Sequence, residues 1–441
     1  MTNVVDWKVK CIPVLSAFGL LVAFVVMIVI LRRGVHYFYT FTAGAAIIGL
    51  TGGLPPMALL QTMGLALVSP NGIKLSYLVF LVTILSHALE HGNFIDDLIG
   101  ASRRLFGSAK RAMLVITNFV GAYIFVPGAV TIAAPAVERA ASSLPPGGKA
   151  ALSVLYHYFI RMAIPFVPSF ILVAQLAGIE EVGAIIKYQL LAAAVGMIVT
   201  YLLYLWKAPE APLGVLSPSP EEIPPHETEI EVEAESLKNR AKSPGRPGDL
   251  FRFWVAAAPL AISLALVYSG VIQLGASLVL ALALVLILAF FLKKKNPINL
   301  MRPNWSLMAT IFGIIILQGV LNETESLNSI IGPALESGVP IEPLVILLPL
   351  VVAYLAGSQN ATVATVYLVL LPAFAAAPNR AIYTAMFYVS GTIGFVLSPI
   401  NIDQAVAREF FNAKPFEFYR AAALPLASFL GAMAILFLLF R

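Results

Sequence analysis

The sequence contains few charged residues and only one cysteine, and both scarcities restrict what the protein can be. Charged residues make up 12% of the 441 residues and hydrophobic residues 59%, whereas a soluble domain carries about 25% charged residues. The composition therefore excludes an ordinary soluble globule. With Cys11 alone, the chain has neither a disulfide framework nor a cysteine-ligated metal cluster, and no resident cofactor is expected.

Long apolar runs rich in Leu, Ala and Ile are what the sequence has instead. They do not alternate with polar residues, which argues against a membrane β-barrel. They predict an all-α polytopic membrane protein, multi-pass in the cytoplasmic (inner) membrane, with the lipid bilayer as its surroundings. The first run, residues 11–31, has no small-residue cleavage pattern and is predicted to be a retained span. No basic patch interleaved with aromatics suggests a nucleic acid partner.

One stretch, residues 208–250, differs from the rest of the chain. It carries eight of the 30 prolines and a run of five alternating glutamates. Such a composition buries too little apolar surface to offset the entropy of ordering. The sequence therefore predicts a first membrane repeat over residues 1–207, a charged linker over 208–250 and a second membrane repeat over 251–441.

The two predicted halves resemble each other at one constant offset. Four identical pairs lie 231 positions apart: Tyr123 with Tyr354, Thr131 with Thr362, Pro168 with Pro399, and Tyr188 with Tyr419. A constant offset through several successive elements indicates an internal duplication, which is common among transporters.

Each half contains one interrupted apolar segment, over residues 112–141 and 344–376, and one proline-broken helix, over 151–177 and 381–410. We interpret the interrupted segments as re-entrant hairpins of two half-helices, each of about 12 to 16 residues and too short to cross about 30 Å alone. That interpretation leaves about five spans per half. Because five is odd, the repeats are expected to be inverted.

Basic residues predict the orientation of the chain. With both termini outside, the cytoplasmic side holds 17 Lys and Arg besides four in the linker, and the outer side holds six. The positive-inside rule therefore places the linker in the cytoplasm and both termini outside. The short apolar run over residues 55–68 leaves an alternative open, because a sixth crossing there would invert everything before it.

Polar residues interrupt the second predicted hairpin at its tip, where Ser358, Gln359, Asn360 and Thr362 occur together. Their oxygens and exposed carbonyls could ligate Na⁺, and half-helix N-termini attract an anion. The first tip is less polar and offers Pro127, Gly128 and Thr131. All seven are candidate substrate-binding residues, with an ordinary polar helix-packing motif as the alternative.

The second proline break places three polar residues near Pro399, namely Ser398, Asn401 and Asp403. Together with Ser358, Asn360 and Thr362 they are candidate ion-coupling residues. A carboxylate at that depth could carry a proton or bind a coupling cation. The alternative is that Asp403 is a hydrated residue at the end of its helix.

Arg161 is expected roughly 15 Å into its span, with His157 one turn earlier on the same face. A cation that deep costs several kcal/mol unless it is paired. A substrate carboxylate or phosphate could supply the partner, so both residues are candidate substrate ligands. The alternative is a structural arginine that contacts Glu138 or backbone carbonyls.

One motif belongs to a different class of protein. His87, Glu90 and His91 match the H-x-x-E-H pattern of inverzincin proteases, in which two imidazoles on one helical face bind zinc. Only Asp96 and Asp97 are nearby as further ligands. Intramembrane metalloprotease is therefore a remote hypothesis, and a hydrated cytoplasmic helix end is the alternative.

Two inverted halves, each with a hairpin and a proline-broken helix, and a Ser-Gln-Asn-Ala-Thr tip together resemble the ion transporter superfamily of secondary carriers. Within it, the chain resembles an uncharacterised family of integral membrane proteins distantly similar to gluconate and dicarboxylate permeases. The resemblance implies a homodimer, with Na⁺ and substrate carboxylates at Ser358, Asn360 and Thr362. Gln359 interrupts the motif of the sodium carriers, and only Thr131 matches it in the first tip.

We therefore expect a secondary active transporter, and not an enzyme, that moves a small organic anion by alternating access with Na⁺ or H⁺. The alternative within transport is a cation/proton antiporter, in which Asp403 carries the exchange and Arg161 is structural. A channel is disfavoured, because the chain shows no ring of charges and no repeated filter.

Overall fold

The computed structural model describes residues 18–106, 108–123, 129–207, 247–292, 297–324 and 340–441. Every regular element among these residues is a helix. Eight of the helices are long and apolar enough to cross a bilayer. The prediction of an all-α, multi-pass membrane protein is confirmed at this level.

The first half begins with a helix over Phe18–Arg32. It continues with α2 (Tyr37–Thr51), α3 (Pro56–Val68), α4 (Pro70–His91), α5 (Phe94–Leu105), α6 (Ala109–Tyr123), α7 (Val130–Ala140), α8 (Pro146–Arg161), α9 (Pro168–Ala177) and α10 (Gly183–Tyr204).

The second half contains α12 (Pro247–Tyr268), α13 (Leu274–Phe291), α14 (Pro297–Leu300), α15 (Trp305–Thr324), α17 (Ile341–Ala356), α18 (Gln359–Thr362), the π-helical turn η1 (Val363–Tyr367), α19 (Leu368–Ala376), α20 (Arg380–Leu397), α21 (Ile402–Phe410) and α22 (Pro415–Phe440).

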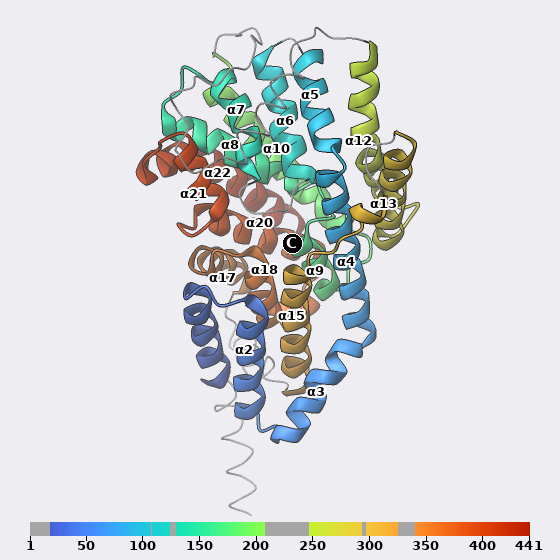
Figure 1. The fold of residues 1–441 in the computed structure, drawn as a ribbon. Helices are drawn as coiled ribbons and strands as arrows, with labels where there is room; N and C mark the ends of the chain where they lie inside the picture. Colours follow the sequence, from blue (N-terminus) through green and yellow to red (C-terminus); the bar gives the residue numbers. More distant parts are fainter. Residues whose placement is uncertain (1–17, 107, 124–128, 208–246, 293–296, 325–339) are drawn as a thin grey trace, which may run out of the picture.

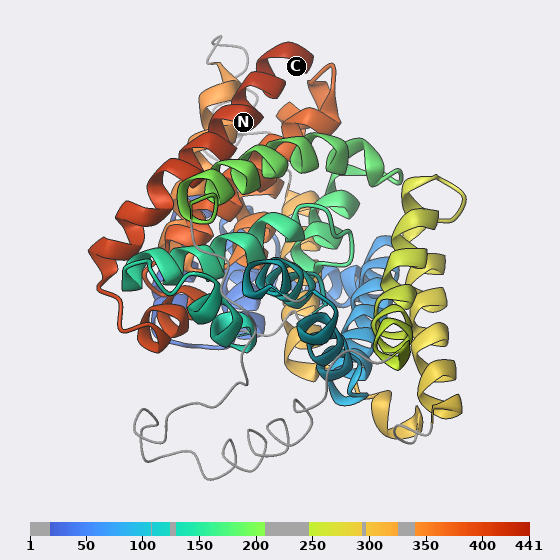
Figure 2. The ribbon, with the colours of Figure 1, turned by 90° about the horizontal axis from the view of Figure 1, so that it is seen from above.

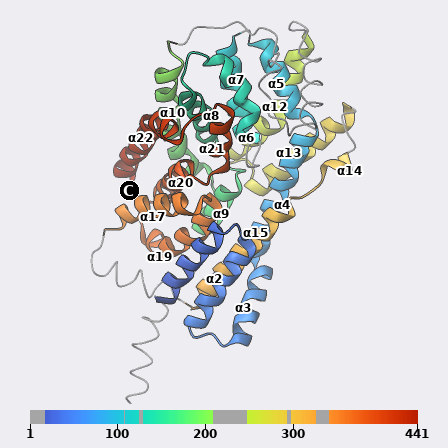
Figure 3. The ribbon, with the colours of Figure 1, turned by 60° about the vertical axis from the view of Figure 1, so that its left-hand side comes forward.

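Helices from both halves pack together throughout the molecule. Figure 1 shows α2, α3 and α15 at one end, and α5, α6, α7 and α12 at the other, with α4 running along the side between them. The grouping of α15 with α2, α3 and α4 is clear in Figure 3. In the view from above, α10 and α22 lie against each other (Figure 2). Both also contact α8 and α20, so helices from the two halves form one packed group of four.

Both predicted proline breaks are present. Helix α8 ends at Arg161 and α9 begins with Pro168, which occupies the first helical position, where its missing N–H costs nothing. Helix α20 ends at Leu397, and α21 starts at Ile402, three residues after Pro399. Each break leaves a short non-helical link whose backbone groups need partners inside the protein.

The second interrupted segment also breaks where predicted. Gly357 ends α17 in the left-handed conformation, with a φ of 57°, and the chain becomes helical again at Gln359. The arm after the break is longer than the predicted 12 to 16 residues, because Gln359–Ala376 runs for 18 residues through the π-helical turn. By length alone this arm can cross a bilayer.

The first interrupted segment consists of α6, with 15 residues, and α7, with 11 residues. The two helices pack against each other. The predicted tip residues Pro127 and Gly128 lie outside the described residues, as does the side chain of Thr131.

The structure does not favour a sixth crossing at the short apolar run. Helix α3 has 13 residues, which corresponds to about 20 Å, and Ser69 alone separates its end at Val68 from the start of α4 at Pro70. That length is well below the roughly 30 Å of a hydrocarbon core.

Two glycines let helices next to the breaks approach backbone to backbone. A Cβ on Gly394 of α20 would lie 2.0 Å from the carbonyl oxygen of Leu350 on α17. A Cβ on Gly121 of α6 would lie 2.5 Å from the carbonyl oxygen of His157 on α8. In each half, the first helix of the interrupted segment, α6 or α17, therefore packs closely against the helix before the proline break, α8 or α20.

Candidate functional site

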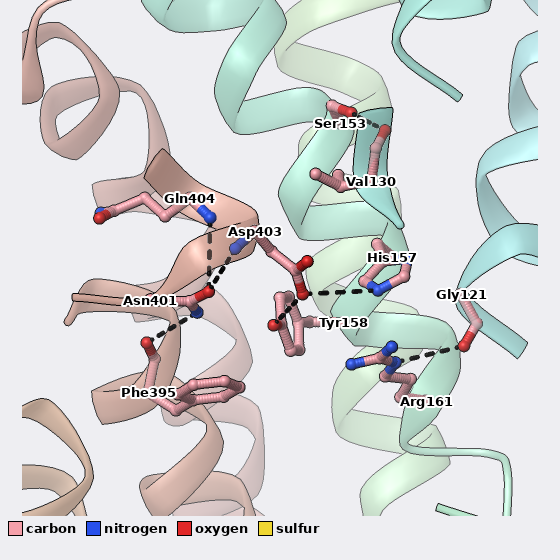
Figure 4. A network of polar contacts seen from close by, with 10 residues as sticks. All are labelled: Gly121, Val130, Ser153, His157, Tyr158, Arg161, Phe395, Asn401, Asp403 and Gln404. Atoms are coloured by element: carbon pink, nitrogen blue, oxygen red, sulfur yellow. Dashed lines mark hydrogen bonds and ion pairs between the residues drawn. The ribbon is translucent and has the colours of Figure 1, made fainter. Parts of the chain in front are cut away.

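Asp403 and three residues of α8 form a charged cluster where the two broken helices meet (Figure 4). The Tyr158 hydroxyl donates a hydrogen bond to Asp403 Oδ2 at 2.5 Å. His157 Nε2 lies 3.8 Å from the same oxygen. The side chains are enclosed, since Asp403 is 4% exposed and His157 1%. We call His157, Tyr158, Arg161, Asn401 and Asp403 the charged cluster.

The start of α21 positions the Asp403 carboxylate. Asn401 is the N-cap, and its Oδ1 accepts hydrogen bonds from the backbone N–H groups of Asp403 at 2.9 Å and Gln404 at 3.4 Å. The Asn401 amide also donates to the Phe395 carbonyl at 3.0 Å, which ties the cap back to α20. A carboxylate in the first turn of a helix interacts favourably with the helix dipole.

Arg161 is the last residue of α8 and lies at the edge of the cluster, half-buried. Its Nε donates to the Gly121 carbonyl at 3.3 Å, and its guanidinium lies 5.2 Å from the centre of the Tyr158 ring. The predicted alternative of a carbonyl contact is therefore present. Glu138, the other predicted partner, forms an ion pair with Lys149.

The burial of Asp403 answers one question that the sequence left open. A hydrated residue at a helix end is not compatible with 4% exposure and a hydrogen bond to a buried tyrosine. A buried carboxylate is stable only when nearby positive charge and hydrogen-bond donors compensate its desolvation. The Tyr158 hydroxyl and the N-terminus of α21 supply part of that compensation, so the buried carboxylate depends on the contact between α8 and α21.

The break between α17 and α18, the predicted second hairpin tip, is a separate polar site. Ser358 caps α18 by accepting from the Ala361 N–H at 3.2 Å, and the Thr362 hydroxyl donates to the Ser358 carbonyl at 2.9 Å. Both hydroxyls therefore serve the local turn. Gln359 Oε1 and Asn360 Oδ1 are buried and accept no hydrogen bond within the described part of the chain. These two amide oxygens, and not the hydroxyls of Ser358 and Thr362, are therefore the unsatisfied acceptors at the tip.

The tip is tied to both breaks through side chains. The Ser398 hydroxyl donates to the Tyr354 carbonyl at 2.7 Å, next to the hairpin tip. Gln359 Nε2 donates to the Tyr388 carbonyl at 3.1 Å, and the Tyr388 hydroxyl lies 2.8 Å from Ser169 Oγ at the start of α9. The Tyr388–Ser169 contact is thus a second junction between the broken helices, and it is uncharged.

The structure divides the predicted site residues into two groups. It joins His157, Arg161, Asn401 and Asp403 in the charged cluster, and it joins Ser358, Gln359, Asn360 and Thr362 with Ser398 around the second tip. Tyr158 was not among the sequence candidates. The signal that could have found it is its spacing, because it lies three residues before Arg161 and so on the same helical face.

The protease-like motif does not form a metal site among the described residues. The rings of His87 and His91 stack with their centres 3.9 Å apart, and His91 Nδ1 lies 3.2 Å from the His87 carbonyl oxygen. No group of three or more His, Cys, Asp or Glu side chains in the described ranges is placed to hold a metal ion. The geometry therefore gives the metalloprotease hypothesis no support.

The fold and the site together define a multi-pass α-helical membrane protein with two broken helices that meet at buried polar junctions. A family model described as "Protein of unknown function (DUF401)" matches residues 238–439, so this part of the chain is similar to that family. A search of curated proteins found no match to the chain.

Proposed function

We propose that the protein is a secondary active transporter of a small organic anion, coupled to Na⁺ or H⁺ and working by alternating access. The observation that carries the proposal is the charged cluster, a buried carboxylate held between helix breaks from distant parts of the sequence. Ionisable groups buried in membrane helices are rare and commonly mark substrate or ion pathways. Paired discontinuous helices are the usual way in which such carriers build their sites.

The helix boundaries support an internal repeat. Equivalent helices of the two halves start between 232 and 234 positions apart: α6 and α17, α8 and α20, α9 and α21, and α10 and α22. Their contacts correspond as well, because α8 packs on α21 as α20 packs on α9. With an odd number of spans per half, such a repeat is inverted, which places equivalent breaks on opposite sides of one central site.

Arg161 supports an anionic substrate. It carries the positive charge of the charged cluster at the end of α8, half-buried and next to the first break. The planar guanidinium matches the geometry of a carboxylate and can bind it through two parallel hydrogen bonds. A small carboxylate is therefore the substrate class that we propose.

The structure offers a candidate for each coupling ion. The free amide oxygens of Gln359 and Asn360 suit Na⁺, which favours uncharged oxygen ligands. The buried Asp403 suits H⁺, and it equally supports the second candidate function, a cation/proton antiporter that exchanges at this carboxylate. Only transport measurements separate these schemes.

The test is uptake of radiolabelled carboxylates into proteoliposomes, after a thermal-shift screen with and without Na⁺ has selected those that bind. An inward Na⁺ gradient and an inward-directed pH gradient are applied separately. We expect one of them to drive accumulation above the level in protein-free liposomes. Cation efflux driven by the pH gradient with no carboxylate uptake would favour the antiporter, and no response to either gradient would defeat both functions.

We also propose the orientation that the basic residues predict, with the linker cytoplasmic and both termini outside. Three exposed tryptophans lie at helix ends, namely Trp206 after α10, Trp254 near the start of α12 and Trp305 at the start of α15, and are consistent with an interface there in either orientation. Tryptophan is enriched at the membrane–water interface. A homodimer is the oligomer that we propose from the superfamily resemblance.

A cysteine introduced at Ser219, in a Cys11→Ser background, is expected to resist membrane-impermeant maleimide in intact cells and to react after permeabilisation. The reason is that the linker then faces the cytoplasm. A cysteine at Lys187, which the topology places outside, is the matched control and should react in intact cells. Labelling of the cysteine at position 219 but not of the cysteine at position 187 in intact cells would show that the chain has the opposite orientation.

A further inference from the structure

We propose that Asp403, assisted by His157 and Tyr158, is the single proton-binding site of the transport cycle, and that it takes up its proton together with the anion held by Arg161. This proposal rests on the transport function proposed above and names its coupling ion. It predicts that a monocarboxylate moves with one proton and without net charge.

The first step is a correspondence between the two junctions of the broken helices. Ser169 and Asp403 are each the second residue after the N-cap of the helix that follows a break, α9 and α21 respectively. Their partners, Tyr388 and His157, lie 231 positions apart on the equivalent helices α20 and α8. The fold therefore builds the same junction twice.

The second step is that the two junctions differ in charge. Ser169 and Tyr388 share a neutral hydroxyl–hydroxyl hydrogen bond of 2.8 Å, which keeps its charge throughout the physiological pH range. The equivalent junction holds a carboxylate next to an imidazole, both almost completely buried. Of the two junctions, the one with Asp403 is therefore the one that can gain or lose a proton. This difference between the junctions is why we assign one proton to each transport cycle.

The third step concerns how a proton is held. Binding forms one O–H bond on Asp403, or one N–H bond on His157, and breaks no other bond within the protein. Neither ring nitrogen of His157 has a hydrogen-bond partner within the described residues, so no other contact fixes which nitrogen carries the proton. His157 Nε2 and Asp403 Oδ2 lie 3.8 Å apart in the same enclosed space, so the two groups form one site for the proton.

The fourth step is the charge balance around the pair. Helices α8 and α7 pack on α21. The titratable and charged residues near the pair on these three helices are His157, Tyr158, Arg161 and Lys149 on α8, Glu138 and Arg139 on α7, and Arg408 and Glu409 on α21. Lys149 and Glu138 neutralise each other in an ion pair. Arg161, which lies over the Tyr158 ring, is the cation in contact with a residue that binds Asp403.

An anion bound at Arg161 therefore removes positive charge from the neighbourhood of Asp403. The buried carboxylate loses part of its compensation, so proton binding becomes more favourable, and by reciprocity a proton favours anion binding. With one anion and one proton bound, the charged cluster then has the same net charge as it has with neither bound. That neutrality is what allows both forms to change conformation inside a bilayer.

The first experiment measures coupling in proteoliposomes, with gluconate as the monoanionic probe. For wild-type protein, each unit of inward-directed pH gradient is expected to support about tenfold accumulation. A potassium diffusion potential set with valinomycin should have no effect. Asp403→Asn should abolish accumulation driven by the pH gradient, yet keep counterflow exchange of gluconate. Ser169→Ala, at the equivalent neutral junction, should still accumulate gluconate in response to the pH gradient, even if the rate of uptake changes.

Different failures have different meanings. If wild-type protein shows neither uptake nor counterflow of any carboxylate, the proposed transport function is wrong. If wild-type protein transports gluconate but Asp403→Asn retains accumulation driven by the pH gradient, the proton assignment is wrong and the transport function stands. Accumulation that follows the potential would overturn the neutral one-to-one coupling.

A second measurement needs no substrate. Infrared difference spectra of the purified protein, recorded between two pH values, report the carbonyl stretch of a carboxyl group that becomes protonated. We expect one such band that disappears in Asp403→Asn and changes position in Tyr158→Phe, because the hydroxyl that donates to Oδ2 is lost. A band that survives in Asp403→Asn, or wild-type spectra without one, would overturn the assignment.

Discussion

Replacement of Gly394 by alanine is expected to prevent the protein from folding. The new Cβ would lie 2.0 Å from the Leu350 carbonyl oxygen, a backbone atom in the middle of α17 that cannot move without the helix. Overpacking against side chains costs about 1–3 kcal/mol, and a clash with backbone is expected to cost at least the upper value. The measurement is the yield of monodisperse protein in detergent and its thermal midpoint.

Gly431→Ala in α22 is the matched control. It is also a helical glycine, but nothing lies within 4 Å of the position that its Cβ would take. It should therefore match the wild type in yield and midpoint. A Gly394→Ala protein that behaves in the same way would mean that α17 and α20 are not packed backbone to backbone.

Arg161→Gln is expected to abolish carboxylate uptake while it leaves the protein folded. The charge is needed mainly when an anion is present, and truncation of one partner of a desolvated charge pair costs about 2–5 kcal/mol. That range corresponds to a loss of affinity of about 30-fold or more. Uptake and thermal stabilisation by the carboxylate should disappear together, and Arg161→Lys should restore part of both, because it keeps the charge without the bidentate geometry.

Arg380→Gln provides the comparison for this variant. Arg380 also donates to a backbone carbonyl, that of Ala177, at 3.0 Å, but it lies at the opposite end of its broken helix and away from the charged cluster. It should retain uptake. Retained uptake in Arg161→Gln would exclude Arg161 from the anion site, whereas loss of folded protein in Arg161→Gln alone would identify it as structural.

The sequence was sufficient to predict the breaks because local chemistry determines them. Pro168, Pro399 and Gly357 each interrupt a helix through their own backbone properties, and each break occurs within a few residues of them. The length of the arm after Gly357 was underestimated, since a π-helical turn carries the helix on to Ala376. Nothing in the composition of Val363–Tyr367 indicates such a turn.

The sequence was insufficient to predict the burial of Asp403. Position within α21 alone is compatible with a hydrated helix end, and what excludes water is α8, more than two hundred residues earlier in the chain. The same applies to the hairpin tip. Ser358 and Thr362 match a cation-binding motif by residue type, but their hydroxyls are used by the capped turn, and only coordinates could show that Gln359 and Asn360 hold the free oxygens.

The contacts between the broken helices also constrain how the protein is made. Helix α9 packs on α20 and α10 packs on α22, so surfaces of the first half are covered only by helices from the end of the chain. At about 5–20 residues per second, roughly 10 to 45 s of translation separate Ala177 from Ile402. During that interval the N-terminal helices are already in the membrane with polar groups such as the Ser169 hydroxyl still awaiting their partners. Assembly of the site is therefore the last event of synthesis, and a ribosome that stalls within the linker leaves an inserted half without the helices that complete it.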